Sequence, residues 1–103
     1  MSKHDFNHKV WLALKLIPRG HITTYKEIAK YLGRSKAVRA VGQACGENPD
    51  APAAPCHRVI KSDGSLCGYA GGVKKKIELL EKEGVKVKLG KVAEFKEKLY
   101  KFK

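Results

Sequence analysis

The residues best suited to chemistry are Cys56 and His57, which stand side by side in the segment Pro55-Cys56-His57-Arg58-Val59. A cysteine attacks as its thiolate, and a free thiol is largely protonated at neutral pH, so a nucleophilic cysteine needs a base. His57 is the adjacent candidate base. Because neighbouring side chains on regular structure point apart, we expect a bridging water to carry the proton between them.

A carboxylate that orients the histidine would complete a relay of the kind found in catalytic triads. Glu83 is our candidate, because it ends the next predicted helix and could fold back onto His57. Glu78 and Glu81 on the same predicted helix compete with it. The alternative interpretation of Cys56 is a buried structural thiol, which the Cys-His pair alone does not exclude.

Two short helices are predicted before the cysteine, and together they resemble a helix-turn-helix. The first covers residues 26–33, where Thr24 and Glu27 have the spacing of a capping box and Gly33 can end the helix in a left-handed conformation. The second covers residues 36–46 and would be the recognition helix.

The second of these helices begins after Ser35, which we expect to cap it. Its exposed face combines the basic Arg39 with the small residues Ala40 and Gly42. A face with so little bulk lets the backbone approach another surface closely. The alternative is an ordinary helical hairpin that happens to expose an arginine.

A bend and a small hairpin are predicted on either side of the cysteine. Asn48 could hold the bend through side-chain hydrogen bonds to nearby backbone, although it could equally be a plain turn residue. Residues 50–55 form an extended loop rich in proline and alanine. Residues 58–61 and 65–67 are strand candidates joined by a turn at 62–64, which predicts a β-hairpin next to the cysteine.

The remaining predicted elements lie towards the two ends of the chain. Asp5 is expected to cap a first helix. A later helix covers residues 73–83, with its lysines, including Lys76, mostly outward. Residues 85–89 alternate like a strand, and residues 91–102 have the apolar spacing of an additional C-terminal helix packed on the core.

The charge balance indicates an acidic partner. The 103 residues carry 22 Lys and Arg against 10 Asp and Glu, a formal net charge of +12. Nucleic acid is the favoured partner and an anionic membrane surface the lesser one, although part of the charge could be a solvated lysine surface. No apolar run approaches the ~20 residues that span a bilayer, and the N-terminus has no signal-peptide pattern.

The cysteines and histidines do not predict a disulfide or a metal. The three cysteines (Cys45, Cys56 and Cys67) are an odd number with no close pair, which fits a reducing compartment and no zinc site. His4 and His8 are four residues apart on a predicted helix, but no third ligand is evident. We therefore expect a cytoplasmic protein, or a nuclear one if the source is eukaryotic, without metal.

The segment from Pro55 to Val59 resembles the active-site motif of the O6-alkylguanine-DNA alkyltransferases (methylated-DNA–protein-cysteine methyltransferases). Further residues fall in the family's order and spacing: Thr24, Tyr25, Arg39, Ala40, Val41, Gly42, Asn48, Pro49, Gly68, Tyr69, Gly71, Lys76, Leu79, Leu80 and Glu83. The resemblance covers nearly all of residues 6–85.

The resemblance implies the family's C-terminal DNA-binding and active-site domain in a single-domain form. That domain would occupy residues 1–103, with a core at about 6–85 and the helix at 91–102 as an addition. The implied fold is mostly α: a compact helical domain with a winged-helix-like helix-turn-helix and a small β-hairpin next to the active site. Zinc in some relatives belongs to an N-terminal domain that we do not expect here.

The same resemblance implies four catalytic roles. Cys56 would accept the alkyl group from O6 of guanine, and His57 would deprotonate Cys56 through a water. Glu83 would orient His57. Asn48 would be the hinge that joins the recognition helix to the active-site loop.

The DNA contacts that the resemblance implies lie on the helix-turn-helix. Arg39 would enter the duplex in place of the extruded nucleotide, and Tyr25 would crowd the 3′ phosphate and promote its rotation. The small face at Ala40 and Gly42 would lie in the minor groove, which admits little bulk.

The implied base pocket lies after the cysteine. Tyr69 would hydrogen-bond the flipped base, and backbone groups at Cys56, Val59 and Ala70 would read its polar edge. A base inside a stacked duplex is out of reach of a nucleophile, so flipping is required.

The implied function is DNA repair by stoichiometric, irreversible transfer of an alkyl group from O6 of guanine, with O4 of thymine as a second candidate substrate. The thioether product is stable, so we expect one turnover per molecule, no cofactor and a monomer acting on duplex DNA that contains O6-alkylguanine. One alternative is an alkyltransferase-like protein that binds the lesion without efficient transfer; such proteins usually have another residue, most often tryptophan, at the cysteine's position. A further alternative is a basic helix-turn-helix regulator.

Overall fold

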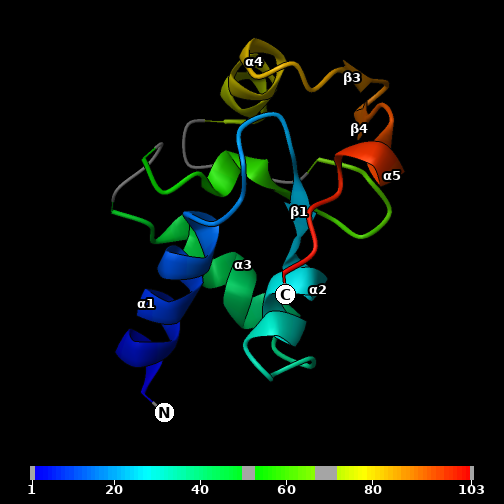
Figure 1. The fold of residues 1–103 in the computed structure, drawn as a ribbon. Helices are drawn as coiled ribbons and strands as arrows, with labels where there is room; N and C mark the ends of the chain where they lie inside the picture. The colour runs from blue at the N-terminus through cyan, green and yellow to red at the C-terminus, as the bar shows by residue number, and fades with distance from the viewer. Residues whose placement is uncertain (1, 50–52, 67–71, 103) are drawn as a thin grey trace.

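The computed structural model describes residues 2–49, 53–66 and 72–102. Helices dominate the fold and the strands are short (Figure 1). The elements in chain order are α1 (Lys3–Leu14), β1 (Thr23–Thr24), α2 (Tyr25–Tyr31), α3 (Val38–Gly46), the 3₁₀ turn η1 (Cys56–Arg58), β2 (Val59–Ile60), α4 (Val73–Lys82), β3 (Val87–Lys88), β4 (Lys91–Val92) and α5 (Phe95–Lys98).

Helix α1 begins at a different cap from the one that the sequence indicates. The Ser2 side chain accepts a hydrogen bond from the Asp5 backbone N–H at 3.1 Å, so Ser2 is the N-cap and the prediction of Asp5 was wrong. Asp5 lies in the first turn instead, where its charge favours the positive end of the helix dipole. The helix packs on α3 through a buried face that includes Val10 and Leu14.

Helix α2 forms as predicted. The Thr24 hydroxyl accepts a hydrogen bond from the Glu27 N–H at 3.0 Å and caps the helix. Gly33 follows the last turn with φ +73°, a left-handed conformation that glycine adopts without strain. The helix packs against α3, and the pair forms the predicted helix-turn-helix (Figure 1).

Helix α3 begins later than predicted, and Ser35 does not cap it. Residues 34–37 form a turn that the hydrogen bond from Ala37 N to Arg34 O closes at 2.8 Å. Ala37 is the N-cap and makes no side-chain cap bond. A cap at Ser35 would have placed Lys36 and Ala37 in the first turn of the helix. They belong to the preceding turn instead.

Strand β2 joins the cysteine segment to the helix-turn-helix. It pairs in parallel with β1, with Thr23 opposite Val59 and Thr24 opposite Ile60. The predicted turn after β2 is present, because Lys61 N donates to Ser65 O at 3.1 Å. Strand β2 nevertheless has β1 as its strand partner, and residue 65 bridges Lys91, so the pairing of the described residues differs from the predicted local hairpin; residue 67 lies outside them.

The C-terminal segment contradicts the predicted helix over residues 91–102. Lys91–Val92 is strand β4, which pairs antiparallel with β3. Glu94 then adopts a left-handed conformation, and only Phe95–Lys98 is helical. The apolar residues whose spacing predicted one helix are instead divided between a strand, a short helix and an extended segment after residue 98.

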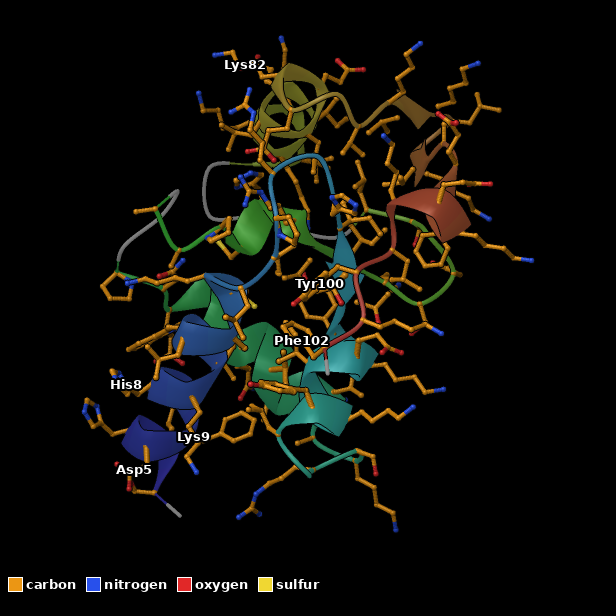
Figure 2. The ribbon with its side chains drawn as sticks, viewed as in Figure 1. Asp5, His8, Lys9, Lys82, Tyr100 and Phe102 are labelled. Carbon is orange, nitrogen blue, oxygen red and sulfur yellow. The ribbon has the colours of Figure 1, made fainter. Side chains whose placement is uncertain are left out.

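The end of the chain lies along β1. The Tyr100 N–H donates to the Ile22 carbonyl at 2.7 Å, and Ile22 N donates to the Lys98 carbonyl at 2.9 Å. The Phe102 ring stacks on Tyr31 of α2 at a centroid distance of 4.7 Å. Figure 2 shows Tyr100 and Phe102 next to the helix-turn-helix.

Strand β2 lies between two apolar clusters. The larger cluster gathers residues of α1, α2 and α3 and includes Cys56 and Val59. The smaller one contains Ile22, Ile60, Leu80, Val85 and Val92. Because side chains alternate along a strand, Val59 faces the first cluster and Ile60 the second. Among the described residues, no helix is long and apolar enough to cross a membrane.

Candidate active site

Cys56 opens the tight turn η1 immediately after Pro55. The turn is held by hydrogen bonds from Cys56 N to Ala54 O at 2.9 Å and from Arg58 N to Pro55 O at 3.0 Å. Cys56 is 4% exposed and packs in the larger apolar cluster. The thiol is therefore shielded from solvent, and a reacting molecule must pass below the protein surface to reach it.

His57 contacts Glu83, as the relay predicts. Its Nε2 lies 3.2 Å from Glu83 Oε2, and both side chains are buried. Glu83 is the C-terminal cap residue of α4, whereas Glu78 and Glu81 are exposed. Of the three candidate carboxylates, only Glu83 is thus placed at the histidine.

Arg58 shares the same carboxylate, and the sequence reading did not assign it a role. Its Nε donates to Glu83 Oε1 at 2.8 Å and its Nη2 to Oε2 at 2.6 Å. Its Nη1 donates to the Ile17 carbonyl at 2.7 Å. This fork-to-fork geometry fixes the carboxylate plane. The signal available in the sequence was an arginine inside an otherwise buried segment, which needs an anionic partner.

The turn between α1 and β1 positions the end of α4. Arg19 Nη2 donates to the Lys82 carbonyl at 2.9 Å. Gly20 has φ +87°, and a Cβ there would lie 3.3 Å from the Glu83 carbonyl oxygen. Glycine therefore permits the close approach that brings Glu83 to the histidine.

The electrostatics favour a neutral histidine beside a charged carboxylate. Burial lowers the pKa of His57 below its ordinary value of 6.5; Glu83 acts in the opposite direction, and the charges of Arg58 and Lys76 lower it further. For Glu83, burial alone would raise the pKa, but hydrogen bonds from Arg58 and His57 bring it below its ordinary value. An ionised Glu83 can only accept hydrogen bonds, so it assigns the proton to Nε2 of His57 and leaves Nδ1 as the basic nitrogen.

Lys76 points inward, whereas the sequence predicted that the lysines of this helix lie mostly outward. It is fully buried, and its Nζ donates to the Val59 carbonyl at 2.7 Å. The same Nζ lies 6.0 Å from the centroid of the Tyr25 ring, within the range of a cation–π contact. Lys76 thus links α4, the strand after Cys56 and the start of α2.

Asn48 holds the bend before the cysteine, as predicted. Its side-chain Nδ2 donates to the Ala54 carbonyl at 2.7 Å. The bond spans the loop between α3 and η1 and attaches the end of α3 to the residue two before Cys56. A rotation of α3 would therefore move the backbone just before Cys56.

Three of the predicted DNA-contacting residues line one surface cavity of about 720 Å³: Tyr25, Arg39 and Gly42. Arg39 is exposed, and nothing lies within 4 Å of the position of a Cβ on Gly42. Lys61, Ser62 and Asp63 of the turn after β2 line the same cavity. The hollow is thus formed by the start of α2, the recognition helix and the turn.

The remaining predicted site residues are not gathered there. Ala40 is half-buried against the larger apolar cluster and lines a different hollow, next to the start of α1. Val59 is fully buried, and its carbonyl is occupied by Lys76. Tyr69 and Ala70 lie outside the described residues. Within the described part of the chain, no group of three or more His, Cys, Asp or Glu could hold a metal ion.

Comparison with known proteins gives consistent matches. A sequence model described as "6-O-methylguanine DNA methyltransferase, DNA binding domain" matches residues 5–85. The methylated-DNA–protein-cysteine methyltransferases of Salmonella typhimurium and Mycobacterium tuberculosis are each 52% identical over 79 residues, which is 77% of this chain and 46% and 48% of those proteins. The chain therefore spans about half the length of these curated relatives.

Two solved structures extend the comparison. The M. tuberculosis protein OGT in complex with DNA superposes with a TM-score of 0.75 at 52% identity, over 77% of this chain and 49% of that one. S. pombe Atl1, bound to damaged DNA containing O6-carboxymethylguanine, superposes with a TM-score of 0.87 at 35% identity, over 99% of this chain and 100% of that one. With its matched segment, its helix-turn-helix and its Cys-His-Glu arrangement, the chain belongs to the 6-O-methylguanine DNA methyltransferase family by its DNA-binding domain.

Proposed function

We propose that this protein repairs DNA by moving an alkyl group from O6 of guanine to Cys56, once per molecule. The observation that carries the proposal is the Cys56-His57 pair with Glu83 at 3.2 Å from the histidine, inside a domain of the methyltransferase family. A structural thiol would need neither the histidine nor its buried carboxylate. Their placement beside Cys56 supports a nucleophilic role for the cysteine.

The step balances as a displacement at the alkyl carbon. The thiolate of Cys56 forms the new S–C bond while the bond between that carbon and O6 breaks, and its electron pair stays on guanine. The proton that the thiol gave to His57 through a water balances the one that guanine takes up. The thioether has no route back to the thiolate, so each molecule acts once. Attack by a thiolate on a carbon requires no cofactor.

His57 suits the role of base because burial keeps it neutral near pH 7. Its proton lies on Nε2, towards Glu83, so Nδ1 can accept the thiol proton. When it does, the imidazolium that forms is stabilised by the Glu83 carboxylate. Arg58 would hold that carboxylate in place, which makes it a positioning residue.

The helix-turn-helix would deliver the base. Cys56 is 4% exposed, so O6 can reach it only after the nucleotide leaves the stack. We propose that α3 lies in the minor groove with Ala40 and Gly42 close to the backbone, that Arg39 fills the gap in the duplex, and that Tyr25 crowds the adjacent phosphate. Unstacking costs a few kcal/mol, which inserted side chains offset.

The base would then lie near Cys56. We propose that Ala70 and the Val59 carbonyl, which has a second lone pair beside the one that Lys76 uses, contribute backbone contacts and that Tyr69 hydrogen-bonds the base. Asn48 would act as the hinge, because its bond to the Ala54 carbonyl connects α3 to the cysteine turn. We also propose that residues 1–103 correspond to the C-terminal domain of longer family members and work on chromosomal DNA, in the cytoplasm or in a nucleus.

A second candidate function is lesion binding without transfer. The match with S. pombe Atl1 favours it, because that match spans nearly all of both chains and that structure holds damaged DNA. Cys56 and its relay favour transfer, since binding alone does not need a nucleophile. A basic regulator without lesion recognition leaves the Cys-His-Glu arrangement unexplained.

One experiment separates these functions. The protein is incubated with a duplex containing O6-methylguanine, and its intact mass is measured beside that of Cys56→Ala. A gain of one methyl group at Cys56, absent in the variant, supports transfer. Tight binding to the lesion duplex with no mass change supports the second function. Binding that is indifferent to the lesion contradicts both.

A further inference from the structure

The β3–β4 hairpin lies beyond the segment that the family model matches, which ends at residue 85. Its two faces differ. Val87 and Val92 are opposite each other, and Val92 is 6% exposed in the smaller apolar cluster. Lys88 and Lys91 are opposite each other on the outer face. Side chains alternate along a strand, so Lys86 points to the same face as Lys88.

The opposed lysines on the outer face of this hairpin reduce its stability when no anion is bound. Like charges directly opposite on neighbouring strands destabilise a sheet. At the tip, Leu89 is fully exposed and has φ +52°, a left-handed conformation that costs an ordinary residue about 1 kcal/mol. Strained and exposed positions of this kind often mark binding surfaces, because a ligand offsets the cost. Anions bound at the two lysines would relieve the repulsion between them.

The hairpin is continuous with the cavity at the recognition helix. Residue 65 pairs with Lys91 in an antiparallel bridge, and Leu66 N donates to the Gly90 carbonyl at 3.0 Å. The turn before residue 65 contributes Lys61 and Asp63 to the cavity that Arg39 lines. Figure 1 shows β3 and β4 on the same side of the molecule as this turn.

One carboxylate faces this surface from the turn, and it does not reverse the charge. Hydrogen bonds from Ser65, first from its side chain and then from its backbone, lower the pKa of Asp63, and the charges of Lys61 and Lys91 act in the same direction. The link between the hairpin and the cavity rim is the bridge between Lys91 and residue 65, which lies two residues after Asp63. The rim therefore continues from Lys61 to Lys91 and Lys88.

We propose that the β3–β4 hairpin is a second DNA-binding element, in which Lys88 and Lys91 bind phosphates of the duplex that flanks the recognition helix. Phosphate fits the site because each of the two opposed lysines can pair with one phosphate of the DNA backbone, while the apolar tip at Leu89 lies against the sugar edge. The contact carries no sequence information and lengthens the footprint. This inference rests on the proposed function, because it takes duplex DNA as the partner.

The test measures how the dissociation constant for a 20–30 base-pair duplex, about two to three helical turns, depends on salt. Each neutralised phosphate contributes about 0.9 to the slope of log K against log salt. The double variant K88Q/K91Q should reduce the slope by about 1.8, so that its affinity loss between 50 and 200 mM salt is about 12-fold smaller than in the parent. K88R/K91R should restore the slope, which separates charge from folding.

The matched control is K9Q/K82Q, which removes two exposed lysines from α1 and α4. Figure 2 shows Lys9 on α1 at the opposite end of the molecule and Lys82 on the side of α4 away from β3 and β4, and neither lines the cavity at Arg39. A slope for K88Q/K91Q equal to that of this control overturns the inference. If the hairpin lysines set the slope but the parent gains no methyl group from a lesion duplex, the proposed transfer fails while the DNA-binding role of the hairpin stands.

Discussion

Replacing Glu83 by glutamine separates the two jobs that its carboxylate performs. That carboxylate accepts two hydrogen bonds from Arg58 and contacts His57, and its side chain is 8% exposed. Removing one member of a buried ion pair costs about 3–5 kcal/mol because the other charge is left uncompensated. Arg58 keeps its bond to the Ile17 carbonyl and is 14% exposed, so we expect a loss of about 3 kcal/mol.

The same change should slow alkyl transfer. Without the carboxylate, the proton of His57 is no longer directed to Nε2 and the imidazolium is no longer stabilised, which should cost about 100-fold in the transfer rate constant. Unfolding in urea gives the stability, and the rate of mass gain on a lesion duplex gives the transfer. Glu78→Gln and Glu81→Gln on the exposed side of α4 are the matched controls, with stability changes within about 0.5 kcal/mol.

The pH dependence provides an independent check on the stability term. The pKa of Glu83 is lower in the folded protein than its ordinary value of 4.5. As the pH falls, the unfolded chain therefore binds the proton first, and the stability that Glu83 contributes is lost as the pH falls below about 4.5. Glu83→Gln should lack this loss.

Two results would refute the reasoning. If Glu83→Gln is less stable but transfers at the parent rate while folded, Glu83 only anchors Arg58 and is not part of a relay. If neither stability nor rate changes, the buried contacts described for this carboxylate do not exist in solution.

Three further predictions address other parts of the site. Because burial lowers the pKa of His57, the transfer rate should hold as the pH falls to 6.5 and decline only below it, and a pH–rate profile with its midpoint at or above 6.5 would contradict this. Asn48→Ala should cost about 1 kcal/mol in urea unfolding through loss of the bond to Ala54, and transfer should slow more than duplex binding weakens. Arg39→Ala should slow transfer from duplex DNA far more than reaction with free O6-benzylguanine, and equal losses on both substrates would exclude a flipping role.

Sequence signals predicted the structure correctly where the interaction joins residues that are close in sequence. The Thr24 cap, the Gly33 stop and the Asn48 bend each depend on residues a few positions apart, and all three are present. The contact between His57 and Glu83 was predicted from the helix end, although two other glutamates fitted the spacing equally well.

The predictions were wrong where contacts between distant parts of the chain determine burial and secondary structure. Lys76 is buried because the Val59 carbonyl and the Tyr25 ring lie over it, which no spacing on its own helix reveals. Residues 91–102 have helical apolar spacing, yet β3 pairs with Lys91–Val92 and the Ile22 backbone binds the end of the chain. Arg58 was missed because Glu83 was assigned to His57 alone, and because its other partner is the backbone carbonyl of Ile17, 41 residues away.

The attachment of the chain's end to β1 has a consequence for how the protein is made. The Thr23 hydroxyl donates to the Tyr100 carbonyl across 77 residues of sequence, so this contact cannot form until residue 100 has left the ribosome. Contacts so far apart close late, because long loops must be ordered first. On the ribosome, β1 therefore remains without this neighbour until residues 98–100 emerge.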